Sequence, residues 1–136
     1  MIQFDNKYFS VFKFTKADTE KHLENAVKDL NIAIIDQILD VKFNYSYNAM
    51  LKAGVALLSF HQLKVKNALG HHIKVIEMLA KLLNDDNVSV LGELMRNKRN
   101  AGLYAGGIII TEKECKDYLE FVKNVVSKVK TIINEK

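Results

Sequence analysis

The chain has 136 residues, of which 49% are apolar and 26% charged, with one cysteine and no proline. This is the length of a single domain that can bury its own core, and one cysteine excludes an intrachain disulfide and a multi-cysteine metal site. The net charge of +4 permits contact with nucleic acid but does not demonstrate it.

The sequence contains no apolar run near the roughly 18 residues that are needed to cross a bilayer. Its first residues, Met1 to Asp5, lack the basic start and apolar stretch of a secretory signal. We therefore expect one cytoplasmic domain over residues 1–136, without membrane contact.

Residues 1–14 are the only stretch with strand-like alternation, and aromatic residues such as Phe4, Phe9 and Phe12 crowd within it. They predict an N-terminal arm that is either a short hairpin or an extended segment packed on the rest of the chain. Every segment after residue 14 is expected to be helical or a connection between helices.

The first two helices are predicted from the spacing of their apolar residues. Thr15 and Asp18 form a capping box for a helix whose apolar stripe extends to Ile38. The pattern breaks over residues 40–45, and a second helix follows over residues 46–60. This second helix is apolar on almost every side and rich in small residues, so we expect it at the centre of the fold.

Two further helices follow a polar connector over residues 61–66. The third is expected to start near Asn67 and to stop at the polar turn of residues 84–87. The fourth is expected over residues 88–103, with a glycine terminator at Gly106.

The final helix has the most regular apolar spacing in the chain and begins at a second capping box, Thr111 with Glu114. Cys115 lies on its apolar face and is expected to be packed in the core. Five helices with short connections predict an all-α, up-and-down bundle.

The fourth helix contains the most unusual segment, in which Arg96, Lys98 and Arg99 place three cations within four residues. Lys98 continues the apolar stripe of this helix, and the cations are spread around its axis. At least one should therefore point towards the bundle or a partner chain, where it needs an anion or a polar cleft. These three residues are therefore the candidate anion-binding residues, and the family resemblance described below implies that the anion is RNA.

A solvated basic turn that complements the helix dipole is the alternative interpretation of this segment. The density of cations, together with Asn100 and Tyr104, favours a site instead. On a regular helix Arg99 and Tyr104 would point about 140° apart. We expect Gly102 to loosen the helix and bring both side chains to one cleft.

Other chemistries have little support in the sequence. His71 and His72 are adjacent, so on a helix they point about 100° apart and cannot chelate one metal together. A polar packing role is expected for at least one of them, and no spacing fixes either as a base beside Arg99. No glycine-rich phosphate loop and no nucleophile with a neighbouring base are visible, so we expect no metal and no cofactor.

These features together resemble the HEPN domains (higher eukaryotes and prokaryotes nucleotide-binding). The resemblance covers residues 15–133 and depends on the order of the helices and on three segments: Tyr47-Asn48-Ala49-Met50 of the central helix, Gly70-His71-His72, and Arg99-Asn100-Ala101-Gly102-Leu103-Tyr104.

The resemblance implies a homodimer, and many HEPN domains are metal-independent endoribonucleases of toxin–antitoxin or antiviral defence systems. Their motif is an Arg, often with a polar residue after it, followed four to six residues later by a His, and two copies face each other across the dimer. The resemblance assigns Arg99 as the catalytic Arg and Asn100 as the polar residue after it, and it places Tyr104 at the position of the His. A phenol of pKa near ~10 is a poor base at neutral pH, whereas Arg99 can still bind phosphate. RNA binding is therefore expected to survive where cleavage is slow or lost.

Two other functions remain open. The bundle could be a non-catalytic dimeric module that binds a partner protein, such as a nucleotidyltransferase antitoxin, with Tyr104 as a phenol open to modification. It could also be a plain structural bundle, for which a solvated Arg99 would be the signature.

Overall fold

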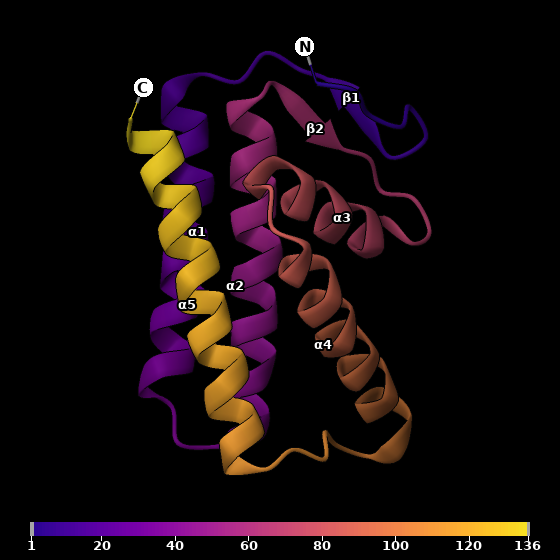
Figure 1. Ribbon diagram of the computed structural model, residues 1–136, viewed down its shortest axis with the longest axis vertical. Coiled ribbons are helices and arrows are strands. Elements are labelled where there is room, and N and C mark those ends of the chain that lie inside the picture. Colours follow the sequence, from indigo (N-terminus) through magenta and orange to yellow (C-terminus); the bar gives the residue numbers. More distant parts are fainter. Residues whose placement is uncertain (1, 136) are drawn as a thin grey trace.

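The computed structural model describes residues 2–135, with the backbone alone at residues 104 and 105. In chain order its elements are β1 (Phe9–Val11), α1 (Lys16–Ile35), α2 (Leu39–Phe60), β2 (Leu63–Val65), α3 (His71–Leu83), α4 (Asp86–Ala105) and α5 (Glu112–Asn134). Helices α1, α2 and α5 lie lengthwise beside one another, and α3 and α4 pack together on the flank of α2 (Figure 1). The predicted all-α bundle of five helices is confirmed.

Helix α2 is the centre of this bundle, as its composition predicts. It contacts all four other helices, and Ala49, Ala53 and Ala56 are completely buried. A Cβ atom placed on Gly54 would lie only 2.7 Å from Val75 Cγ1 of α3. The small residues of α2 therefore let neighbouring helices approach it closely.

A second glycine brings α3 and α4 together. A Cβ atom on Gly92 of α4 would lie 2.7 Å from Ile76 Cγ2 of α3 and 3.5 Å from Met50 Sδ of α2. This close contact sets the distance between the two helices that line the candidate site described below.

The break between the first two helices comes earlier than expected. Helix α1 ends at Ile35, and Asp36 adopts an extended conformation with its Oδ1 accepting a 2.9 Å hydrogen bond from the Ile38 N–H. Lys42 Nζ then donates a 2.8 Å hydrogen bond to the carbonyl of Ala33 near the end of α1. Because Asp36 turns the chain, the predicted apolar stripe does not reach Ile38, which is 64% exposed.

The N-terminal arm is one half of a small sheet. Strand β1 pairs antiparallel with β2, with Phe9 opposite Val65 and Val11 opposite Leu63. Phe9 and Leu63 are buried in a cluster with Leu58 of α2 and with Val75 and Met78 of α3. The expectation that residues 61–66 form only a polar connector was therefore wrong, because the arm supplies the partner that turns them into a strand.

The ends of the later helices agree only partly with the ends predicted from the sequence. Helix α3 starts after Gly70, whose φ is 81°, rather than at Asn67. Helix α4 stops at Gly106 in the left-handed conformation, as expected, and Thr111 caps α5 in a capping box.

Gly102 does not loosen α4, which continues to Ala105. A Cβ atom at Gly102 would lie 2.6 Å from Ile108 Cγ1, so the glycine instead makes room for the chain that returns towards α5. Within residues 2–135, the structure contains no helix that is both long enough and apolar enough to cross a bilayer.

Candidate nucleic-acid interface

The last turns of α4 present three polar side chains towards α2 and α3. Arg96, Arg99 and Asn100 are three and four residues apart, so they share one face of the helix. Arg96 and Asn100 line a groove with the start of α3, and Arg99 lies over the ring of Tyr47 on α2. At least one of the cations thus faces the bundle, as the sequence predicts.

Lys98 is not part of this group. Its Nζ donates a 3.0 Å hydrogen bond to the carbonyl of Ile109 and lies 3.5 Å from Glu114 Oε2 at the start of α5. The side chain is 24% exposed. The structure therefore separates Lys98 from Arg96 and Arg99, and its positive charge holds the α4–α5 connection.

Arg96 is paired with a carboxylate of its own helix. Its Nε and NH2 atoms donate hydrogen bonds of 3.1 and 2.6 Å to the two carboxylate oxygens of Glu93. These hydrogen bonds lower the pKa of Glu93 and raise the pKa of Arg96. The charge of Arg96 is largely balanced, so an incoming anion would have to share this guanidinium with Glu93.

Arg99 is held by an aromatic ring. Its Cζ atom lies 5.6 Å from the centroid of the Tyr47 ring, in a cation–π arrangement. Among the described residues, neither an ion pair nor a hydrogen bond joins the Arg99 guanidinium to another group. A guanidinium that stacks on a ring through one face keeps its edge available for a phosphate.

Tyr47 joins α2 to both neighbouring helices. Its side chain is completely buried, and this burial raises the pKa of the phenol to about 12, against the opposing influence of Arg99 and Arg96. Its hydroxyl lies 3.4 Å from Nδ1 of His72, the second residue of α3. One neutral phenol therefore touches both the arginine of α4 and a histidine of α3.

The two histidines pack against each other at the start of α3. Their ring centroids are 4.5 Å apart, and His71 Nδ1 lies 3.0 Å from the carbonyl of Ala68. Burial lowers the pKa of His72, and the positive groups of His71, Arg99 and Arg96 lower it further. Polar packing of these histidines was predicted, but the closeness of His72 to the arginines was not, because it depends on how α3 meets α4.

Gly70, His71 and His72 form one wall of the groove, and Arg96 and Asn100 form the other. The volume of this groove is about 450 Å³. No carboxylate lines it, so its described walls present only neutral and positive polar groups together with apolar ones. This arrangement fits an anion of moderate size.

The position of the Tyr104 side chain is outside the described part of the chain, and only its backbone is placed, in the last turn of α4. Its assignment to the place of the motif histidine therefore stays a prediction.

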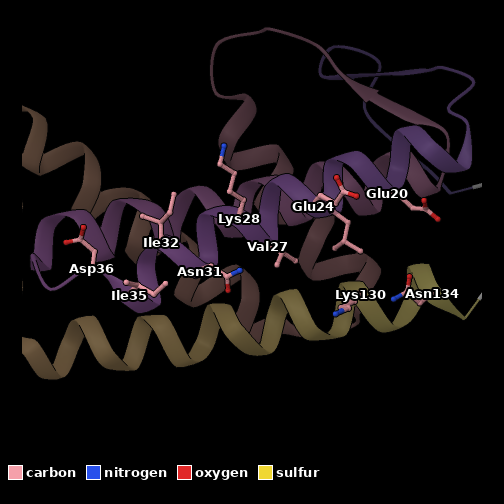
Figure 2. Close-up of a pocket in the computed structure, with 11 residues that line it drawn as sticks. Glu20, Glu24, Val27, Lys28, Asn31, Ile32, Ile35, Asp36, Lys130 and Asn134 are labelled. Carbon is pink, nitrogen blue, oxygen red and sulfur yellow. The ribbon is translucent and has the colours of Figure 1, made fainter.

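A second groove lies between α1 and α5 (Figure 2) and has a volume of about 800 Å³. Asn31 and Ile35 of α1 and Lys130 of α5 point towards the space between these helices (Figure 2). Ile35 is 77% exposed. The surface of this groove is mainly apolar, so it fits a protein side chain better than a phosphate.

Comparison with models of known protein families, with curated proteins and with solved structures found no match. Within the described residues, no group of three or more His, Cys, Asp or Glu side chains is arranged to hold a metal ion.

Proposed function

We propose that this protein is a HEPN-like RNA-binding protein of the metal-independent endoribonuclease type, with Arg99 and Asn100 in its binding site. The observation that supports this best is the placement of Arg99 on the buried ring of Tyr47, whose hydroxyl lies 3.4 Å from His72 in the wall of a groove without carboxylates. A phosphate in the groove would meet a held guanidinium, which costs less entropy than ordering a free arginine.

RNA cleavage through a 2′-hydroxyl needs a group that takes its proton and a group that stabilises charge on the phosphate. Arg99 is suited to the second task. In this chain Tyr104 stands at the position of the group that would take the proton, and its phenol is a weak base at neutral pH. The proposal is therefore strong binding of RNA, with cleavage that is slow or lost.

The biological setting that we propose is a cytoplasmic toxin–antitoxin or defence system. In it the protein would act as a homodimer, with the Arg99–Asn100 sites of two subunits close to each other. Pairing two such sites would double the number of phosphate contacts and steepen the dependence of RNA affinity on salt.

Substitution of Arg99 by alanine tests this proposal. Loss of a charge-assisted contact to phosphate should weaken binding of single-stranded RNA by about 10- to 100-fold, and abolish any cleavage or toxicity. Lys123→Ala, on the exposed side of α5, is the control because it removes one positive charge away from the groove. Equal RNA binding by Arg99→Ala and the unchanged protein, with equal helical circular dichroism, would refute the site.

The second candidate function is a non-catalytic dimeric module that binds a partner protein, such as a nucleotidyltransferase antitoxin. The apolar groove between α1 and α5, with its exposed Ile35, favours it. Stable co-purification with the product of an adjacent gene would support this function. Strong ribonuclease activity of the protein alone would argue against it.

A further inference from the structure

The groove between α3 and α4 contains a histidine that lies outside the Arg99-to-Tyr104 segment. His72 lines this groove together with Arg96 and Asn100, and its Nδ1 lies 3.4 Å from the hydroxyl of Tyr47. We propose that His72 binds RNA by donating its Nε2–H to a phosphate oxygen, and that Tyr47 is the positioning residue that holds the hydrogen on Nε2. This inference rests on the function proposed above and adds a second contact from another helix.

The first step concerns the hydrogen of the Tyr47 hydroxyl. Tyr47 is buried and its pKa is about 12, so the phenol keeps its hydrogen at neutral pH. A buried hydroxyl needs an acceptor, and Nδ1 of His72 is the partner within reach. Nδ1 then has no hydrogen of its own, and in the neutral ring the hydrogen is on Nε2.

The second step concerns the charge of His72. The groups that face it are His71 on α3, Tyr47 on α2, Arg99 and the Glu93-paired Arg96 on α4, and Lys66 before α3, which lines a separate groove on the other side of His72. Burial and these positive groups lower its pKa, so the imidazole is uncharged at neutral pH.

A neutral ring with its hydrogen on Nε2 is a donor at that atom and cannot accept a proton there. His72 therefore donates a hydrogen bond to a phosphate oxygen, beside the guanidinium edge of Arg99. It does not supply the base that RNA cleavage would need. The uncapped start of α3, where Gly70 provides no side-chain acceptor, adds partial positive charge on the same side. The groove is thus arranged to hold a phosphodiester more than to cleave it.

Two substitutions of His72 separate the donor from the ring. His72→Gln keeps an N–H near the position of Nε2, whereas His72→Phe keeps the ring shape without any donor. Measured by fluorescence anisotropy with a single-stranded RNA of about 12 nucleotides, His72→Phe should bind about 10-fold more weakly and His72→Gln within about threefold of the unchanged protein. His61→Gln, at the end of α2 and outside the groove, is the control and should bind as the unchanged protein does.

A spectroscopic measurement tests the positioning role of Tyr47. The nitrogen chemical shifts of the His72 ring should show hydrogen on Nε2 in the unchanged protein and a mixture of tautomers in Tyr47→Phe. RNA affinity of the unchanged protein should also change little between pH 7 and pH 8, where the lowered pKa keeps His72 neutral.

Three results would overturn the inference: RNA binding by His72→Phe equal to that of the unchanged protein, hydrogen on Nδ1 in the spectrum, or binding that is tighter at pH 7 than at pH 8 by a difference that disappears in His72→Gln. If Arg99→Ala still weakens binding in those cases, the proposed function stands and only the role of His72 falls. Absence of RNA binding by the unchanged protein would overturn both.

Discussion

The groove between α1 and α5 and the groove between α3 and α4 differ in size and in chemistry, and the smaller one contains the groups that could bind RNA. The groove between α1 and α5 is about 800 Å³ and mainly apolar, with Val27 and Ile32 among its lining residues. The groove between α3 and α4 is about 450 Å³ and has two histidines, an arginine and an asparagine in its walls. Size alone would select the first, but its lysines share the groove with the carboxylates of Glu20, Glu24 and Asp36, which repel a phosphate. No carboxylate lines the second groove, so its positive and donor groups are better suited to phosphate.

The two grooves also differ in how they are built. The smaller groove depends on the close approach of α3 and α4 at Gly92 and on one buried tyrosine that touches both helices. The larger groove lies between α1 and α5, and its exposed Ile35 is the last residue of α1. Changes to one groove should therefore leave the other intact, which makes the comparison testable.

The largest expected effect comes from crowding the contact between α3 and α4. Gly92→Val would place its side chain against Ile76 and should lower the free energy of unfolding by about 2 kcal/mol, and it should weaken RNA binding as the groove widens. Urea denaturation and anisotropy measure both quantities. Ala101→Val, exposed on α4, is the matched control and should change neither by a comparable amount. Unchanged stability in Gly92→Val would show that the contact is not as tight as described.

The next effect concerns the larger groove. In the second candidate function this groove holds the partner protein, so Ile35→Glu would put a charge into an apolar interface and should weaken binding of a co-purifying partner about 10-fold or more, as measured by isothermal titration calorimetry. Val90→Glu adds the same charge at an exposed position of α4 and should have little effect. Equal partner binding by Ile35→Glu and the unchanged protein would exclude this groove from the partner interface.

A smaller effect should follow from releasing Arg96. Glu93→Gln removes the carboxylate that balances this guanidinium while keeping the side-chain shape. RNA affinity should rise about threefold to fivefold, because exposed ion pairs of this kind contribute up to about 1 kcal/mol. Glu120→Gln, which releases Lys123 on α5, is the control with the same charge change. A fall in affinity would mean that Glu93 positions Arg96 rather than competing for it.

The smallest effect is on the pH dependence of stability. Burial lowers the pKa of His72 and of His61, so the unfolded chain binds more protons than the folded one as the pH falls below about 6.5. The free energy of unfolding should decrease from pH 7 towards pH 5, and the decrease should be smaller in His72→Gln. Denaturation curves at several pH values measure this, and an identical slope in both proteins would contradict the lowered pKa of His72.

The helices were predictable because their signals are local. The capping boxes at Thr15 and Thr111 and the glycine at Gly106 mark real helix ends, and the apolar spacing places α2 at the centre. The sheet was not predictable to the same degree. Residues 62–66 alternate polar and apolar side chains, but this signal is short, and residues 63–65 form a strand because residues 9–11, far away in the chain, pair with them.

The candidate site, too, was predictable only where its signals lie within one helix. The sequence identified Arg96, Arg99 and Asn100, whose spacing on one helix places them on a common face. The sequence also predicts Lys98 in the same RNA-binding group, but in the structure Lys98 lies 3.5 Å from Glu114 at the start of α5, apart from Arg96 and Arg99. The sequence does not predict that His72 lies near Arg99, because the two residues belong to different helices and no spacing within one helix relates them.

Local periodicity, capping residues and glycines thus specified the number, type and order of the helices, since each depends on neighbours within a few residues. The tertiary structure alone placed Tyr47 and His72 against the α4 face and paired the arm with the segment after α2. The physical reason is that helix packing is decided by the fit of side chains from distant segments, such as Gly92 against Ile76, and this fit leaves no periodic signal in the sequence.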